Sequence, residues 1–148
     1  ILLQLPDNGG IVMINFFSGF VVPESARNVS NMFELTRQWE AEYGDNKEAI
    51  DRERARYRAN HPIYPGTVHD VVDHIEHVIK VAGIDHVGLG SDFDGVPTVP
   101  KQLEDVSTYP VITQALLNRG YSEEDIHKVL SGNIMRVIQK AEQVSKEL

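Results

Sequence analysis

HVGLGSDFDGV, residues 86–96, is the stretch that decides the fold. Its first half is apolar and rich in glycine, as in a buried strand of a parallel sheet, and it runs directly into Asp92 and Asp94. In parallel α/β proteins the functional side chains lie at the carboxyl ends of the strands, where the loops converge. Asp92 occupies that position, and a carboxylate beside a buried strand is costly to desolvate. The stretch therefore predicts an α/β protein in which Asp92 has a chemical role.

The two aspartates receive different interpretations. We interpret Asp92 as a general acid/base or as an electrostatic anchor for a cationic group. Desolvation at the end of the strand would tune the protonation of its carboxylate. For Asp94 we favour an Asx turn that caps the following segment, with Gly95 supplying a positive φ angle. Gly88 and Gly90 alternate along the strand, so one of its faces carries no side chains. Such a face is expected where a neighbouring layer or a ligand approaches closely.

A second apolar run, IVMINFF at residues 11–17, is interrupted only by Asn15 and predicts another buried strand. Between the two strands, residues 68–82 carry apolar side chains at helical spacing, preceded by the capping residue Thr67 and ended by Gly83. Further helices are predicted at residues 28–43, 46–60, 107–118 and 123–146, the last with a break at Gly132 and Asn133, while residues 18–26 are predicted to form a loop.

The order strand, helices, strand, helices is typical of a parallel α/β protein with right-handed crossovers. We expect the two strands to be parallel neighbours. Two strands alone would leave bare edges and a half-covered apolar face. Residues 1–5 also resemble the end of a helix whose start is missing. We therefore expect residues 1–148 to be the C-terminal part of a larger single domain.

Composition narrows the classes of function. The net charge is -8 over 148 residues and the basic residues are interleaved with acidic ones, which argues against a nucleic-acid surface. The chain has no cysteine, so any metal would need His, Asp or Glu ligands. No apolar run approaches the roughly 18 residues of a membrane span. We expect a soluble, cytoplasmic protein and leave a homodimer open.

His74 and His77 have the i, i+3 spacing that can place two imidazoles on one metal ion, with Asp70 and Asp73 nearby. The helical phase, however, puts His77 roughly opposite the apolar stripe and His74 on its flank, away from the strand ends. We therefore interpret both histidines as surface side chains and predict no metal ligand in this chain.

Four segments occur in an order and spacing that carry a family resemblance: IVMINFF, DVVDHIEHVIKVAG, VAGIDHVGLGSDFDGV and LEDVSTYPVITQALLNRGYSEEDIHKVLSGNIMRVI. Together they cover nearly the whole chain, which resembles the C-terminal part of the membrane dipeptidase (renal dipeptidase) family of zinc metallopeptidases. The resemblance implies a (β/α)8 barrel, with residues 11–17 as strand seven and 86–91 as strand eight. It implies hydrolysis of dipeptides at a site of two zinc ions whose ligands lie upstream of this chain. It also implies that Asp92 transfers protons during attack of the metal-bound water.

Asn15, at the end of the first strand, is a candidate for substrate binding, the alternative being a strand-end side chain that bonds to the backbone. Phe16, Phe17 and Phe20 are interpreted as packing residues rather than as a specificity wall.

Two other functions remain open. An apolar strand followed by Asp-x-Asp-Gly is similar to the haloacid dehalogenase phosphatases, in which Asp92 would be the nucleophile and Asp94 the acid/base. The chain could instead be a non-catalytic fragment of a larger barrel. A phosphate-release assay with magnesium would distinguish the phosphatase from a zinc dipeptidase.

Overall fold

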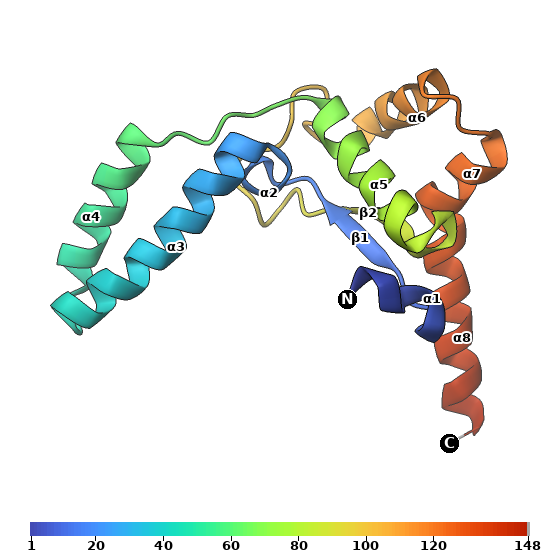
Figure 1. The fold of residues 1–148 in the computed structure, drawn as a ribbon, viewed down its shortest axis with the longest axis horizontal. Helices are drawn as coiled ribbons and strands as arrows, with labels where there is room; N and C mark the ends of the chain where they lie inside the picture. Colours follow the sequence, from blue (N-terminus) through green and yellow to red (C-terminus); the bar gives the residue numbers. More distant parts are fainter. Residues whose placement is uncertain (148) are drawn as a thin grey trace.

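The computed structural model describes residues 1–147 (Figure 1). Within them, one sheet pairs β1 (Val12–Asn15) with β2 (Val87–Ser91), and the two strands run parallel. Val12 faces Val87 and Ile14 faces Leu89 before the register shifts, so that Asn15 faces Ser91. The prediction that the two strands are parallel neighbours is confirmed. Their assignment as strands seven and eight of a barrel stays a prediction.

β1 ends two residues earlier than predicted because a side-chain oxygen replaces the neighbouring strand as the acceptor of the next backbone hydrogen bond. The backbone N–H of Phe16 still donates to Ser91 O at 2.9 Å, but that of Phe17 donates to Asn15 Oδ1 at 2.7 Å. The chain then turns directly into the short helix α2 (Ser18–Val21).

Helix α5 (Val68–Ala82) covers one face of the sheet, as the sequence predicts. A capping box fixes its start: Thr67 N–H donates to Asp70 Oδ2 at 2.8 Å, and Thr67 Oγ1 accepts from His69 N–H at 3.3 Å. The apolar stripe of the helix is buried against the strands, which places the main core between this helix and the sheet. The stripe consists of Val68, Val71, Val72, Ile75, Val78 and Ala82, and the strands contribute Ile14, Val87 and Leu89.

The opposite face of the sheet is only partly covered by residues 1–147. Met13 of β1 lies across the glycines of β2, where a Cβ added at Gly88 would come within 2.8 Å of its sulfur. Met13 is nevertheless 38% exposed. The bare face predicted from Gly88 and Gly90 is therefore filled in part by a side chain of the neighbouring strand.

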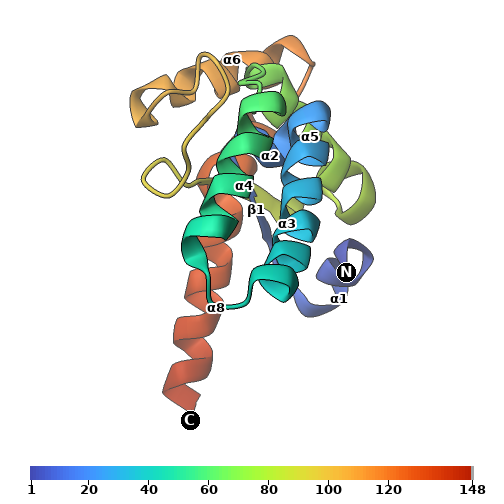
Figure 2. The ribbon, with the colours of Figure 1, turned by 90° about the vertical axis from the view of Figure 1, so that its left-hand side faces the viewer.

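Two helices between β1 and α5 form a hairpin that projects from the rest of the molecule (Figures 1 and 2). They are α3 (Pro23–Tyr43) and α4 (Lys47–Asn60), joined by a turn at Gly44. The loop predicted at residues 18–26 is wrong, because α2 and the first turn of α3 occupy it. Pro23 suits the first helical position, and the buried Ser25 Oγ accepts from Tyr64 N–H at 2.8 Å, a tertiary contact that local sequence does not reveal.

The N-terminal residues form two short helical turns, η1 (Leu2–Gln4) and α1 (Leu5–Asn8), before β1. The connection from α5 to β2 is the turn η2 (Ile84–His86). No helix within residues 1–147 has both the length and the apolar character needed to cross a lipid bilayer.

The C-terminal region continues as helices that pack beside α5 and β2. They are η3 (Val106–Thr108), α6 (Tyr109–Asn118), α7 (Glu123–His127), η4 (Lys128–Gly132) and α8 (Asn133–Glu147). The break predicted at Gly132 and Asn133 is wrong: the helix continues through η4, a π-helical turn. Asn133, buried at the end of that turn, donates through Nδ2 to Ile84 O at 2.7 Å and to Val87 O at 2.9 Å. At this wider turn, the Asn133 side chain thus links the last helix to the backbone at the start of β2.

Replacing Asn133 with alanine is expected to destabilise the protein by about 1–3 kcal/mol, because two backbone carbonyls would lose their donor in a buried place. The measurement is the midpoint of urea unfolding of the full-length protein. Asn118→Ala is the matched control, since Asn118 is exposed and bonds only to Gln114 within residues 1–147. Equal midpoints for the two variants would contradict the role given to Asn133.

Candidate functional site

Asn15 and Asp92 meet at the carboxyl ends of β1 and β2, although 77 residues separate them in the sequence. Asn15 Nδ2 donates to Asp92 Oδ2 at 2.8 Å, while Asn15 Oδ1 accepts from the backbone N–H of Phe17 at 2.7 Å. A backbone N–H must face an oxygen, so the contact with Phe17 fixes which way the amide points. The nitrogen of Asn15 is therefore directed at the carboxylate of Asp92.

The backbone at the end of β2 adopts an unusual conformation. Ser91 has φ 47° and Asp92 has φ 76°, both in the left-handed region that L-residues rarely enter. A hydrogen bond from Gly95 N–H to Asp92 O, 3.1 Å long, closes the turn that follows. Backbone strain of this kind is concentrated at functional sites, and Asp is among the residues that tolerate it best. The strain coincides with the residue that the sequence singles out.

The expectation for Gly95 is wrong, because the positive φ angles fall at Ser91 and Asp92 instead. Space is what requires glycine at residue 95: a Cβ placed there would lie 2.4 Å from Asp92 Oδ1. The predicted Asx turn at Asp94 is not found within residues 1–147 either, since backbone groups of Asp92 and Gly95 close the turn. Asp94 itself is exposed.

Phe93 anchors this turn to the core. Its ring lies edge-on to Phe16 with centroids 5.8 Å apart, and 6.3 Å from the ring of Tyr109 in α6. Phe16 is fully buried, as its interpretation as a packing residue requires. Phe17 and Phe20 also pack on each other, with centroids 4.9 Å apart, although Phe20 is 51% exposed. Through Phe93, the turn that carries Asp92 thus packs against the rings of Phe16 and Tyr109.

Asp92 is exposed, so the desolvation expected at the strand mouth is not present within residues 1–147. The reason is the one-sided packing of the sheet: the helices cover the face that carries Ile14 and Leu89. What the structure provides at this carboxylate is orientation, through the hydrogen bond from Asn15, rather than burial.

The histidines of α5 do not form a metal site. His74 Nε2 lies 3.2 Å from Val21 O, and His77 is exposed. The nearby acids are also engaged, Asp70 in the capping box and Asp73 in an ion pair with Arg119 at 2.6 Å. Among residues 1–147 no three His, Asp or Glu side chains are grouped closely enough to hold a metal ion. The residues described here do not by themselves fit a zinc site.

Arg119 joins the end of α6 to α5 through Asp73 and Glu76. Partial burial acts to lower the pKa of Arg119, but hydrogen bonds and attraction from the two carboxylates outweigh it and raise the pKa above its usual value. The guanidinium therefore remains charged, and these carboxylates serve helix packing rather than chemistry.

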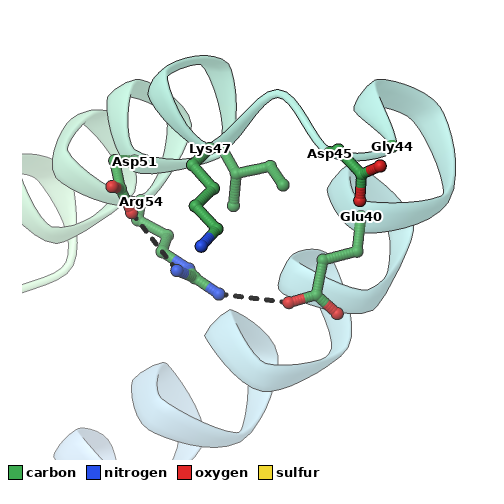
Figure 3. A pocket seen from close by; sticks show the side chains of 7 residues that line it. Glu40, Gly44, Asp45, Lys47, Asp51 and Arg54 are labelled. Carbon is green, nitrogen blue, oxygen red and sulfur yellow. Dashed lines mark hydrogen bonds and ion pairs between the residues drawn. The ribbon is translucent and has the colours of Figure 1, made fainter.

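A charged hollow lies at the tip of the hairpin, between the end of α3 and the start of α4 (Figure 3). Arg54 is part of its lining and forms ion pairs with Glu40 and with Asp51, each at 3.2 Å. A cation already paired with two carboxylates is suited to joining the helices rather than to binding an anion. None of the residues lining this hollow comes from β1, β2 or the turn at Asp92. We therefore place the candidate site at the strand ends.

The candidate site as a whole consists of Asp92, Asn15 and Gly95. The sequence identified Asp92 from its position after the strand and identified Asn15 as a polar residue at a strand end. It missed that these two side chains bond to each other, and it gave Gly95 the wrong reason. Once the strands are taken as parallel neighbours, their carboxyl ends must coincide, and that signal could have paired Asn15 with Asp92.

Comparisons with known proteins agree on one family. An uncharacterised dipeptidase of Schizosaccharomyces pombe is 36% identical over 149 residues, which is 100% of this chain and 27% of that protein. The dipeptidase tcpJ of Claviceps purpurea is 49% identical over 79 residues, 53% of this chain and 19% of that protein. The chain thus spans about a quarter or less of the length of these curated relatives.

Solved structures show the same relationship. The crystal structure of the probable dipeptidase PvdM from Pseudomonas aeruginosa matches with a TM-score of 0.68 and 27% identity, over 91% of this chain and 38% of that one. A metallo peptidase from Rhodobacter sphaeroides, liganded with a phosphinate mimic of the dipeptide L-Ala-D-Ala, matches with a TM-score of 0.60 and 26% identity, over 93% of this chain and 29% of that one. The family description "Membrane dipeptidase (Peptidase family M19)" matches residues 1–148. The chain therefore belongs to the membrane dipeptidase family.

Proposed function

We propose that this chain is the C-terminal part of a metallodipeptidase, with β1 and β2 as strands seven and eight of a (β/α)8 barrel and Asp92 as the residue that transfers protons. The observation that carries the proposal is the placement of Asp92: its carboxylate lies at the carboxyl end of β2, oriented by Asn15. In barrel enzymes this end of the strands is where catalytic side chains gather. Family membership and the dipeptidase relatives support dipeptides as the substrate class.

In this proposal the two carboxylate oxygens of Asp92 have different tasks. Oδ2 accepts the hydrogen bond from Asn15, whereas Oδ1 faces Gly95 and receives no side-chain donor within residues 1–147. Peptide hydrolysis requires that the attacking water lose a proton and that the departing amine gain one as the C–N bond breaks. Oδ1 is the oxygen available to accept the first proton and to return it to the amine.

We propose two zinc ions as the cofactor, with all of their ligands outside this chain. Among residues 1–147, no group of His, Asp or Glu side chains could hold these ions. Substrate binding by Asn15 is a rival proposal for this residue: one of its two N–H groups is used by Asp92, and the other would bind a substrate carbonyl, so removal of the amide would raise KM. A soluble cytoplasmic enzyme and a homodimer stay predictions from the sequence.

The full-length protein is expected to release free amino acids from a panel of dipeptides. Metal analysis of the same preparation is expected to find zinc in about a two-to-one ratio to protein. A phosphate ester supplied with magnesium serves as the comparison substrate, because the phosphatase alternative predicts its hydrolysis. Phosphate release without dipeptide cleavage would overturn the proposal in favour of that alternative. No hydrolysis of either substrate by a zinc-loaded, folded protein would favour the non-catalytic alternative.

A further inference from the structure

We propose that Asn15 is a positioning residue that holds the Asp92 carboxylate in one orientation, and that Gly95 leaves the room which this orientation needs, so that a single oxygen faces the reacting atoms. This inference rests on the proposed function of Asp92 and goes beyond it, because it assigns how an exposed side chain is kept ready for proton transfer. Neither residue needs to touch the substrate for this role.

Asn15 restrains the carboxylate from the side of β1. Its amide is itself held at the other end, where Oδ1 accepts from Phe17 N–H at 2.7 Å, so the Nδ2 that reaches Asp92 at 2.8 Å has little freedom to swing away. Hydrogen bonds to an ionised group are among the stronger ones in proteins. The restraint therefore extends from the backbone after β1 through the amide to Asp92 Oδ2.

Gly95, at the other end of the turn, leaves room for this orientation of the carboxylate. A Cβ at residue 95 would lie 2.4 Å from Asp92 Oδ1 and 3.2 Å from Asp92 Cγ. The backbone of Gly95 does not have a positive φ angle, so glycine is required there for room and not for conformation. Its N–H also donates to Asp92 O at 3.1 Å, which keeps the turn closed around the side chain.

An exposed aspartate must be held in one orientation to transfer protons efficiently. A free side chain exchanges among staggered rotamers, whereas proton transfer requires the oxygen within hydrogen-bond reach of the reacting group. Because burial does not fix Asp92 within residues 1–147, the hydrogen bond from Asn15 is what fixes it, and the absence of a side chain at Gly95 leaves this orientation free. Loss of the hydrogen bond, or of the room at residue 95, should therefore slow turnover without weakening substrate binding.

In the full-length enzyme, Asn15→Ala is expected to lower kcat by about 10- to 100-fold, the worth of a hydrogen bond to a charged group, with KM changed by less than about threefold. Asn15→Asp keeps an oxygen for Phe17 N–H at nearly unchanged size but loses the donor, so it should lower kcat at least as far. The control Asn118→Ala removes an exposed amide of α6 and should leave kcat and KM unchanged. A rise in KM at constant kcat for Asn15→Ala would overturn the positioning role in favour of substrate binding.

A double-mutant cycle separates positioning from general structural support. If Asn15 acts through the carboxylate, then Asn15→Ala added to Asp92→Asn should lower the residual kcat by less than about twofold. An undiminished effect in the double mutant would overturn the inference even if Asp92→Asn alone proves severe. Full turnover in Asp92→Asn would instead defeat the proposed function itself, so the two failures are distinguishable.

Gly95→Ala gives an independent test from the other side of the turn. The nearest atom to the added methyl group is an oxygen at the end of a side chain and not backbone, so the protein should fold with an unchanged melting temperature, while displacement of the carboxylate lowers kcat about tenfold or more. Unchanged kcat in a folded Gly95→Ala protein would overturn the part of the inference that concerns Gly95.

Discussion

Asparagine in place of Asp92 is expected to lower kcat of the full-length enzyme by roughly 10²- to 10⁴-fold, the range attributed to general acid/base catalysis. The amide has the same shape as the carboxylate and its oxygen can still accept from Asn15, but it cannot take up the proton of the attacking water. Asn also tolerates the φ of 76° at this position, so the fold should be kept. Steady-state kinetics on a dipeptide, with a melting curve as the check on folding, measure the effect.

Asp94→Asn is the matched control for this experiment. Asp94 lies two residues further along the same turn, is exposed, and undergoes the same change of one oxygen to nitrogen. We expect kcat to change by less than about twofold, since the hydrogen bond that orients the Asp92 carboxylate comes from Asn15 and not from Asp94. A phosphatase that used Asp94 as its acid/base would lose activity in this variant as well. Normal turnover of Asp92→Asn beside an intact fold would rule out the role assigned to Asp92.

Phe16→Ala is expected to be the most damaging change to stability, at about 3–5 kcal/mol. Phe16 has 0% of its surface exposed and packs edge-on against Phe93 and Tyr109, with ring centroids 5.8 and 6.0 Å away. Alanine would leave a cavity that the surrounding structure closes only in part, and it would remove the ring on which Phe93, in the turn that carries Asp92, packs. Urea unfolding of the full-length protein should show a lower midpoint.

Phe33→Ala makes the same chemical change on the surface of α3, where the side chain is 55% exposed. It should cost no more than about 0.5 kcal/mol. If Phe33→Ala and Phe16→Ala shifted the unfolding midpoint equally, the aromatic cluster would not be the support that the geometry describes.

The elements that the sequence predicted correctly are those whose sequence patterns lie within a few neighbouring residues. The helix at residues 68–82 has its capping residue, Thr67, directly before it and its apolar period within it, and both were found from the sequence. The loop predicted at residues 18–26 and the break predicted at Gly132 failed for the opposite reason. In both places a buried polar side chain, Ser25 or Asn133, bonds to backbone that is distant in sequence, to Tyr64 or to Ile84 and Val87.

By itself, the sequence determined that two buried strands alternate with amphipathic helices and that an aspartate follows the second strand, because hydrophobic period and capping are properties of neighbouring residues. Only the tertiary structure decided that Asn15 donates to Asp92, that Ser91 and Asp92 take up left-handed backbone, and that Gly95 is needed for room. Parallel pairing brings strand ends together across 77 residues, and a contact of that kind depends on register and on atomic distances that no local pattern specifies.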